Sequence, residues 1–194
     1  MKGKALKVLS LLIIIIGSTL SLSTQAGNDL PKLMNYEGIE LILNGQGTRT
    51  IVFVKIYESG LYLNSANNNG EEIINQDSAM AIRLEVLSSF LTDKKMKNTI
   101  DKAFVKSTKG NPEPIAGQIS QFMAALNKAV AVGDVVAVGD VYEFIYLPQS
   151  GLHVRKNAKH LDTIAGLDFK KAFFGIWLSD AAVQDSLKNN MLGN

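Results

Sequence analysis

The sequence predicts an α+β fold, in which one face of a large antiparallel sheet is covered by a layer of helices. β-prone and helical segments come in runs (strands, two helices, strands, helices), and this segregation is typical of the class. The two central helical segments are amphipathic, so each needs an apolar surface to cover. The 194 residues include no cysteine, so the core must hold by apolar packing alone.

The first strands are predicted from apolar runs bounded by turn residues. Residues 39–43 lead into Asn44-Gly45-Gln46-Gly47, and Asn-Gly is a strong two-residue hairpin signal because both turn positions need positive φ. Residues 50–63 are rich in Val, Ile, Phe and Tyr and predict one long strand, with a break at Ser59-Gly60 as the alternative. Another strand is predicted at 81–87, where apolar residues alternate.

Two helices and a hairpin follow. A helix with Thr92 as its cap is predicted to continue to about residue 106, because apolar residues recur every four positions. A second helix is predicted at 115–129, after a break rich in Gly and Pro. Residues 141–147 and 152–155, separated by Pro148-Gln149-Ser150-Gly151, predict a hairpin.

The C-terminal segment is predicted to be helical again. Phe169, Phe173 and Trp177 form one stripe, which we expect to pack in the core first and to line a pocket second. A last short helix is predicted at 181–192.

The hexapeptide Val-Ala-Val-Gly-Asp-Val occurs twice in tandem, at 130–135 and 136–141. Two copies are too few for a solenoid, which needs at least three stacked units. We interpret the repeat as a local duplication that leaves one copy as a surplus extended or looped segment.

The first 26 residues are predicted to be a secretory signal rather than part of the fold. Three lysines precede a short apolar core at 8–16, and residues 23–26 form a small-residue cleavage site. The apolar core is well short of the roughly 20 residues that a membrane helix needs, and an uncleaved anchor is the alternative. The mature chain, residues 27–194, is then expected to be one exported domain with no stable membrane anchor.

Removal of that segment changes the charge of the protein. The full chain has 20 Lys+Arg and 18 Asp+Glu, and three of the lysines lie in the first 26 residues. The mature chain therefore has 17 basic and 18 acidic residues and a net charge of −1. No basic surplus is left to indicate a nucleic-acid partner.

The motifs of common enzyme classes are missing from the sequence. His153 and His160 stand seven residues apart with no cysteine or carboxylate cluster beside them, which does not make a zinc site. The sequence also lacks a P-loop, a dinucleotide fingerprint and a Gly-x-Ser-x-Gly elbow. We therefore expect neither a metal nor a cofactor.

Arg49 is the binding residue that the pattern itself indicates. It stands between the glycine-rich segment and the β-prone run, and its planar guanidinium offers two parallel donors to a carboxylate or carbonyl oxygen. The alternative is structural, because an arginine at the end of a strand often pairs with a nearby carboxylate or turn carbonyl.

Short segments spread over the mature chain point to a known family. They are Asn44-Gly45-Gln46-Gly47-Thr48-Arg49, Phe53-Val54-Lys55-Ile56-Tyr57, Gly60-Leu61-Tyr62-Leu63, Gly139-Asp140, Tyr146-Leu147-Pro148 with Gly151, and Phe169 through Ile176-Trp177-Leu178. In order and spacing they resemble the exported bacterial branch of the chalcone isomerase-like family. The resemblance implies an open-faced β-sandwich with a ligand cleft between sheet and helices, and a periplasmic location.

The resemblance also implies two kinds of activity. The family contains isomerases, which close a ring by attack of a phenolate on an enone, and non-catalytic members that bind fatty acids. Arg49 matches the family's arginine, and Tyr57 takes the place of the isomerases' strand threonine, as in the fatty-acid-binding branch, where an arginine and a tyrosine hold the carboxylate. Met96, Thr99 and Ala103 stand where the isomerases have tyrosine, lysine and asparagine. If that network supplies about 3 kcal/mol, its loss slows the reaction about a hundredfold.

Arg49 and Tyr57 pose a geometric difficulty. On one straight strand, eight residues separate them by about 26 Å at about 3.3 Å per residue, too far for one carboxylate to touch both. They converge only if the chain turns or bulges between them, and no Gly or Pro occurs between residues 50 and 56 to announce this.

Three functional hypotheses follow. The leading one is an exported, non-catalytic binder of a fatty acid or similar amphipathic ligand such as a phenolic compound, with the tail in the cleft and the head at Arg49 and Tyr57. The second is an isomerase of chalcone-like small molecules with weak activity. The third is a structural or partner-binding protein of the envelope, whose cleft is filled by its own side chains.

Overall fold

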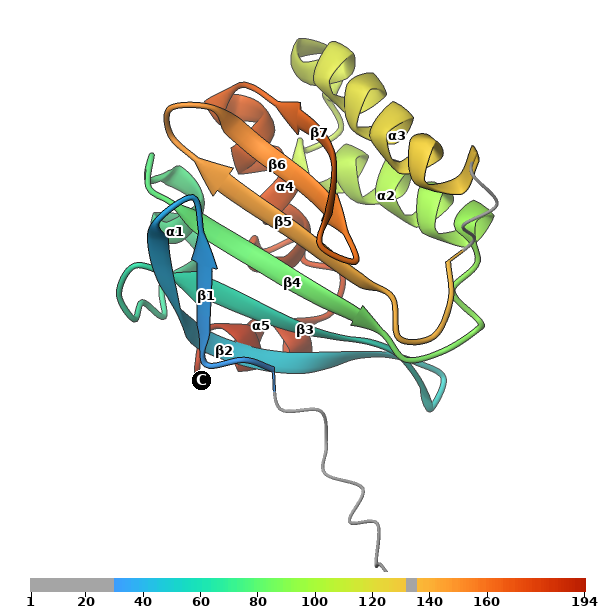
Figure 1. Ribbon diagram of the computed structural model, residues 1–194, viewed down its shortest axis with the longest axis horizontal. Helices are drawn as coiled ribbons and strands as arrows, with labels where there is room; N and C mark the ends of the chain where they lie inside the picture. Colours follow the sequence, from blue (N-terminus) through green and yellow to red (C-terminus); the bar gives the residue numbers. More distant parts are fainter. Residues whose placement is uncertain (1–29, 132–135) are drawn as a thin grey trace, which may run out of the picture.

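A seven-stranded antiparallel sheet dominates the computed structural model, which describes residues 30–131 and 136–194 (Figure 1). The strands lie in the sheet in chain order, so each pairs with the next. They are β1 (Leu33–Tyr36), β2 (Ile39–Ile51), β3 (Val54–Leu63), β4 (Met80–Val86), β5 (Val141–Leu147), β6 (Gly151–Lys156) and β7 (Lys159–Ile164). The helices are α1 (Gly70–Asn75), α2 (Asp93–Ser107), α3 (Ala116–Ala131), α4 (Leu167–Leu178) and α5 (Asp185–Met191), with a 3₁₀ turn η1 (Glu113–Ile115) before α3.

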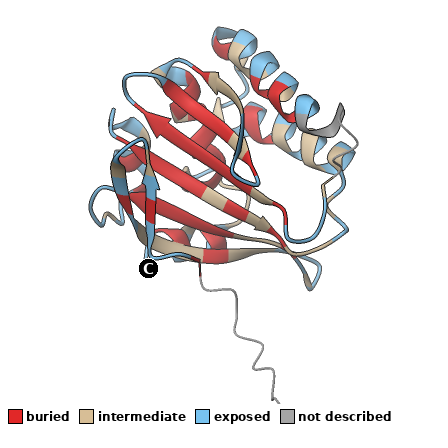
Figure 2. Cartoon of the chain, viewed as in Figure 1, coloured by how far each residue is buried: buried red, intermediate tan, exposed pale blue. Residues whose placement is uncertain are grey.

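The helices form a layer on one face of the sheet. α4 passes behind the central strands, α5 packs against β2, α3 packs against β7, and α2 packs mainly against α4 (Figure 1). Buried residues concentrate on the central strands and on α4, whereas the outer sides of α2 and α3 are exposed (Figure 2). The predicted α+β class, an antiparallel sheet with one helical layer, is confirmed.

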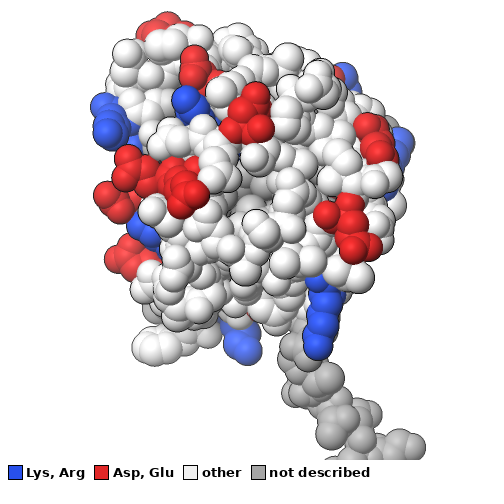
Figure 3. Space-filling model, turned by 90° about the vertical axis from the view of Figure 1, so that its left-hand side faces the viewer, with Lys and Arg blue, Asp and Glu red and all other residues white. Residues whose placement is uncertain are grey.

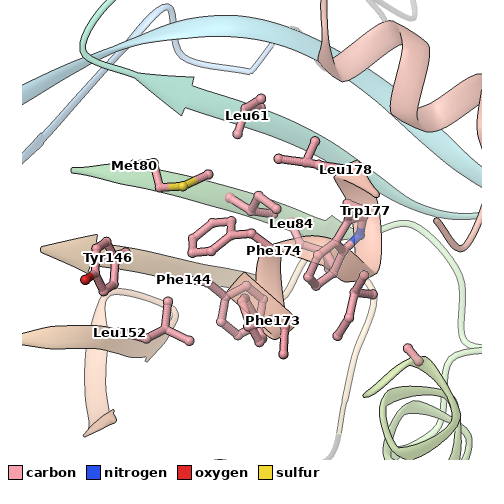
Figure 4. Packing of buried hydrophobic residues seen from close by; sticks show 14 of the residues in the cluster. Leu61, Met80, Leu84, Phe144, Tyr146, Leu152, Phe173, Phe174, Trp177 and Leu178 are labelled. Carbon is pink, nitrogen blue, oxygen red and sulfur yellow. The ribbon is translucent and has the colours of Figure 1, made fainter. Parts of the chain in front are cut away.

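An aromatic core fills the space between sheet and helices (Figure 4). The ring of Phe173 lies 5.1 Å from that of Phe122, 5.0 Å from Phe144 and 5.3 Å from Trp177, measured between ring centroids. Phe169 is buried as well, so the aromatic stripe of the C-terminal segment packs in the core as predicted. Truncating one such ring to alanine typically costs about 3–5 kcal/mol.

The sheet curls, so that β1 crosses the face away from the helices. The Tyr36 hydroxyl on β1 lies 3.0 Å from Nδ1 of His153 on β6, although four strands separate β1 and β6 in the sheet. Beneath β1, a second and smaller core includes Met34, Leu41 and Tyr62. β1 thus covers part of a face that would otherwise meet water.

The single strand predicted over residues 50–63 is wrong, because the chain reverses at Val52-Phe53. β2 ends at Ile51 and β3 starts at Val54. Both turn residues have positive φ, 43° and 67°, as in the type I′ turn that normally takes Asn and Gly. A non-glycine residue held in this region costs about 1–3 kcal/mol, so Val and Phe are uncommon at such turns. For this reason the pair gave no turn signal in the sequence.

The turn predicted at Asn44-Gly45 is also wrong, because both residues lie inside β2 at an irregularity in its pairing with β3. Gly45 allows α5 to approach closely, since a Cβ at this position would overlap the backbone oxygen of Asn190. Asn44 also holds α5 against β2, because its Nδ2 donates to the carbonyl of Met191, the last residue of α5, at 2.9 Å. The glycine-rich segment is therefore a docking surface for α5.

The strand predicted at 39–43 continues through the glycines to Ile51, and the remaining expected elements agree with the structure to within a few residues. The helix predicted at 92–106 is α2, and Thr92 is its N-cap, with its hydroxyl accepting from the Lys95 N–H at 3.4 Å. The helix predicted at 115–129 is α3, and the predicted hairpin is β5–β6. Residues 1–26 and residues 132–135 of the duplicated hexapeptide lie outside the described residues.

A buried lysine ties α4 to the end of α1. Lys170 is fully buried, and its Nζ donates to the carbonyls of Ile73, Ile74 and Gln76 at 2.9, 2.8 and 2.7 Å. Carbonyls at a helix C-terminus lack partners within the helix, so the ammonium satisfies groups that burial would leave unpaired. Burial lowers the pKa of Lys170 to about 8.

Gly45→Ala should destabilise the protein by more than about 2 kcal/mol, because the added methyl group must displace the backbone of α5 from β2. Gly117→Ala in α3 is the matched control. An added Cβ meets nothing within 4 Å there, and we expect stability to be unchanged or raised by up to about 1 kcal/mol. Urea denaturation of both variants measures the difference, and equal stabilities would contradict the close packing of α5 on β2.

Candidate functional site

Arg49 and Tyr57 are direct partners on neighbouring strands. The turn at Val52-Phe53 folds β3 back along β2, and the register places Arg49 opposite Tyr57. Such cross-strand neighbours have Cβ atoms about 5 Å apart, in place of the roughly 26 Å expected on one straight strand. The geometric difficulty therefore disappears, because the residues belong to two strands joined by a turn. Both side chains lie on the helical face, where Arg49 meets Gln184 and Tyr57 meets Trp177.

Arg49 is held by an amide rather than by an acid. Its Nη1 donates to Oε1 of Gln184 at 2.8 Å and to the carbonyl of Thr50 at 3.3 Å. Gln184 is the N-cap residue of α5, and its side chain also joins the Thr50 N–H at 3.0 Å and the Thr48 carbonyl at 3.2 Å. Within the described residues, no carboxylate lies at ion-pair distance from the guanidinium. Because Arg has five N–H donors, most of them stay available to a ligand.

Tyr57 carries a hydroxyl group whose oxygen is hydrogen-bonded and whose proton has no acceptor among the described residues. Its oxygen accepts a hydrogen bond from Nε1 of Trp177 at 3.1 Å, and it donates to no acceptor among the described residues. Burial raises the pKa of Tyr57 to about 12, although the Trp177 hydrogen bond and the Arg49 charge both act to lower it. At neutral pH the group is therefore an uncharged donor with one vacant direction.

An apolar cavity of about 60 Å³ lies beside Tyr57, between the sheet and the helices. The sheet supplies its floor with Tyr57, Leu84, Tyr142 and Phe144, α4 supplies Phe173, Ile176 and Trp177, and the remaining walls come from Leu91, Met96, Thr99, Ile100, Ala103, Phe122 and Val183. Figure 4 shows several of these side chains turned toward one another from sheet and helix. Val183 precedes Gln184, so the residue that holds Arg49 is joined directly to the cavity wall.

The N-terminal half of α2 forms the outer wall of this cavity, and it is the least buried part of the wall. Met96, Thr99 and Ala103 all line the cavity. These are the positions at which the resemblance implies tyrosine, lysine and asparagine in the isomerases. The first buried residue of α2 is Ala103, so its first ten residues make only partial contact with the rest of the protein.

Two larger hollows lie elsewhere and include neither Arg49 nor Tyr57, whereas the apolar cavity includes Tyr57 but not Arg49. One, of about 470 Å³, is lined mostly by polar and small residues of the segment 64–67 and of α1 and its following loop. The other, of about 740 Å³, lies between α1, the end of α2 and the C-terminal residues. The hollow beside Tyr57 has the apolar walls expected of a site for a hydrocarbon chain.

No pattern in the sequence indicates Gln184 as a site residue or the hydrogen-bonding role of Trp177. Gln184 lies 135 positions from Arg49, and a polar residue before a short helix has no pattern that links it to a distant strand. Trp177 was expected as a core residue, and it is buried, but its indole N–H also fixes the hydroxyl of Tyr57. A buried Trp needs a partner for its N–H, which is the one signal that could have indicated such a contact.

The described residues contain no group of three or more His, Cys, Asp or Glu side chains that could hold a metal ion. The rings of His153 and His160 lie 5.9 Å apart, and the ring nitrogens of His153 contact the hydroxyls of Tyr36 and Ser150. Among the helices of the described part of the chain, none is long and apolar enough to cross a bilayer.

Comparison with known structures gives a match to a fatty-acid binding protein of Arabidopsis thaliana. The two chains are 11% identical, the TM-score is 0.67, and the match covers 84% of this chain and 90% of the plant protein. At this identity the likeness concerns the fold, and the open-faced arrangement of sheet and helices is shared. A sequence comparison with curated proteins gives no match.

A family model described as chalcone isomerase-like matches residues 22–193. The match covers almost all of the part that the structure describes, including both strands of the Arg49–Tyr57 pair and the helices over them. The chain belongs to the chalcone isomerase-like family.

Proposed function

We propose that the protein binds a fatty acid or a similar amphipathic carboxylate beside Tyr57 and does not catalyse a reaction on it. One observation carries the proposal, namely that Tyr57 lines an apolar cavity and is paired across the sheet with Arg49, which lies outside the cavity lining. The hydroxyl of Tyr57, a residue of the cavity wall, belongs to the cross-strand partner of a cation that has no acid partner among the described residues. A hydrocarbon tail in the cavity and a carboxylate at its edge satisfy both groups. The name of the plant protein of similar fold supports the same ligand class.

The tail supplies most of the affinity. Burying eight methylene groups contributes about 6 kcal/mol at about 0.8 kcal/mol each, before the costs of ordering the ligand. The head group then mainly fixes the orientation, because a carboxylate is held by charge-assisted bonds from Arg49 and by the Tyr57 hydroxyl.

Ligand entry requires α2 to move outward. A volume of about 60 Å³ is well below the roughly 300–1,000 Å³ of typical ligand pockets. The N-terminal half of α2 has no buried residue before Ala103, while Phe104 anchors the second half in the aromatic core. The helix can therefore hinge about its second half at a smaller cost than α4 or the central strands, most of whose cavity residues are buried.

The composition of the cavity wall favours binding over isomerisation. Met96 and Ala103 offer a thioether and a methyl group to the cavity, and the Thr99 hydroxyl donates its proton to the carbonyl of Lys95 at 2.8 Å. None of them can stabilise a developing enolate as a lysine and an asparagine would. The protein therefore binds its ligand without isomerising it, and Arg49 and Tyr57 have binding roles.

Arg49→Ala should weaken binding of palmitate about tenfold, because one charge-assisted interaction with the carboxylate is lost. Binding of hexadecanol, which has the same chain and no charge, should change less than threefold. Displacement of a fluorescent fatty acid by each compound measures both affinities. Equal loss for acid and alcohol would contradict a head-group role for Arg49, and no uptake by the wild-type protein would remove the proposal.

Two matched variants of α2 test whether the hydrocarbon tail of the ligand lies under this helix. Ala103→Leu adds three carbons at the cavity wall and should weaken palmitate and hexadecanol alike by tenfold or more. Val105→Leu enlarges a side chain that is 47% exposed, two positions further along the same helix, and should leave both affinities unchanged. If both variants bind like the wild type, the tail does not lie under α2.

The role of Tyr57 as a neutral donor makes a prediction about pH. Its pKa is about 12 in the folded protein and about 10 in an unfolded chain. Above about pH 10 the unfolded chain loses this proton while the folded protein keeps it, so the free energy of unfolding falls as pH rises from about 10 to 12. Tyr57→Phe has no such proton, and its stability should fall less steeply over this range. Guanidinium denaturation at about pH 9, 10 and 11 compares the two, and parallel curves would contradict the raised pKa.

We also propose that the protein is exported, most simply to the periplasm, on the basis of the signal-like segment at residues 1–26. Expression of the full chain in a bacterial host should yield a protein that has lost these residues, so that the mature N-terminus is Gly27. Intact-mass measurement of the purified protein tests this directly. An unprocessed mass in the membrane fraction would favour an uncleaved anchor instead.

A further inference from the structure

We propose that the protein docks on anionic lipid bilayers through the end of the sheet that carries the β2–β3 turn. Three consecutive apolar residues are exposed there, since Ile51, Val52 and Phe53 are 48%, 81% and 96% exposed. Phe90, also exposed, follows β4 in the chain. An exposed apolar cluster of this kind on a folded protein marks a site of interaction. We call Ile51, Val52, Phe53 and Phe90 the apolar tip.

The two parts of the apolar tip lie at the same end of the molecule. β4 runs beside β3 until Val86 stands opposite Tyr57, and the Leu87 N–H still donates to the carbonyl of Ile56 at 2.9 Å. Residues 88–90 therefore leave the sheet next to the first residues of β3. In Figure 1 the β2–β3 turn and the loop from β4 to α2 both lie on the right-hand side of the view.

The backbone of the turn indicates that its side chains serve something outside the fold. Both turn residues have positive φ, a conformation that suits Asn-Gly and is strained for a β-branched or aromatic residue. Neither Val52 nor Phe53 offsets this strain by packing, because both project into solvent. Burial of these two side chains by a partner supplies the packing that the fold itself does not provide.

The charge around the apolar tip selects an anionic surface. Residues 50–57 and 88–99 include Lys55, Lys94, Lys95 and Lys97 but only one acid, Asp93. The Lys95 ammonium lies 5.0 Å from the centre of the Phe90 ring, so cation and aromatic ring face the same region. Figure 3 shows the opposite end of the molecule, where several acidic clusters are exposed. Aromatic and apolar residues flanked by lysines are the composition of segments that insert shallowly into anionic bilayers.

The proposed docking end adjoins the cavity. Leu91 and Met96, which line the cavity, lie directly beside Phe90 and Lys95 in the sequence, and Tyr57 is four residues from Phe53. A protein docked in this way presents the cavity to the lipid phase, where acyl chains are found. Docking itself needs no ligand in the cavity, so it stands or falls separately from the proposed function.

A fluorescent label tests the docking on the full chain. The chain has no cysteine, so Ser89→Cys gives a single labelling site beside Phe90, and Ser65→Cys gives one just beyond the far end of β3. With vesicles of phosphatidylcholine and phosphatidylglycerol, we expect a blue-shifted emission and quenching by lipid-borne quenchers at position 89 only. Equal responses at both positions would overturn the proposal, since they would place the contact elsewhere.

Substitutions in the turn give the second test. Val52→Asn together with Phe53→Gly fits the backbone of the turn and should keep or raise the denaturation midpoint, while it lowers vesicle affinity at least tenfold in sedimentation assays. Leu33→Ser, at a residue of β1 that is 50% exposed, should change vesicle affinity less than twofold. Unchanged vesicle binding by the double variant would overturn the proposal. So would self-association in solution that the double variant abolishes, because the occupant of the tip would then be a second copy of the chain.

Failure of the docking and failure of ligand binding can be told apart. Ala103→Leu, which should weaken palmitate binding, should bind vesicles like the wild type, because Ala103 is buried, carries no charge and is not part of the apolar tip. The double turn variant should bind palmitate in detergent-free solution with unchanged affinity at equilibrium. Loss of palmitate binding in the turn variant would overturn the separation of the two surfaces.

Discussion

The register between β2 and β3 is the constraint on which the site depends. Because the chain turns within two residues, Arg49 comes to lie opposite Tyr57. Side chains alternate between the faces of a sheet, so a slip of one residue in one strand would send one of the pair to the other face. Docking of the helical layer completes the arrangement, because α4 brings Trp177 to Tyr57 and the segment before α5 brings Gln184 to Arg49.

The polar groups of the site are positioned by neutral partners, unlike those on the opposite face of the sheet. There, Arg83 and Arg155 both pair with Glu143, at 2.8 and 2.9 Å, so that one carboxylate is shared between two cations across three strands. Arg49 instead meets the amide of Gln184, which fixes its direction without cancelling its charge. Trp177 does the same for Tyr57, since its indole N–H occupies the oxygen and leaves the hydroxyl proton free. Among the described residues, both donors are thus held in place by neutral groups, and no acid offsets the charge of Arg49.

The sequence predicted those elements whose signals are local. The periods of α2, α3 and α4, the Thr92 cap and the β5–β6 hairpin all depend on residues near one another in the chain, and they were found. The β2–β3 turn was missed because Val and Phe occupy a conformation that normally selects Asn and Gly. Asn44-Gly45 was misassigned for a related reason. A glycine is needed at position 45 because α5 approaches closely there. This contact joins residues 145 positions apart, so no local pattern reveals it.

Arg49 could be found from the sequence because it borders an unusual segment, whereas its pairing with Tyr57 followed from resemblance alone. What the pattern could not supply was the distance between them, since this depends on where the strand ends. The same limit applied to Gln184, whose contact with Arg49 exists only because α5 docks on the glycines of β2. The contacts between residues of the candidate site therefore depend on tertiary packing, whereas the helices and strands that carry them are determined largely by local sequence.

The small volume of the cavity is related to the partial burial of the N-terminal half of α2, which forms one of its walls. Apolar walls without a guest lose dispersion contacts, so a wall that can close does so. The part of α2 that closes over this cavity is also the part that carries Lys94, Lys95 and Lys97 on its other sides. Met96 lies between two of these lysines in the sequence, so the segment that lines the cavity also bears the charge beside the apolar tip. The wall of the cavity and the lysines of the proposed docking surface thus share one short segment, while Phe104 anchors the second half of the same helix in the aromatic core.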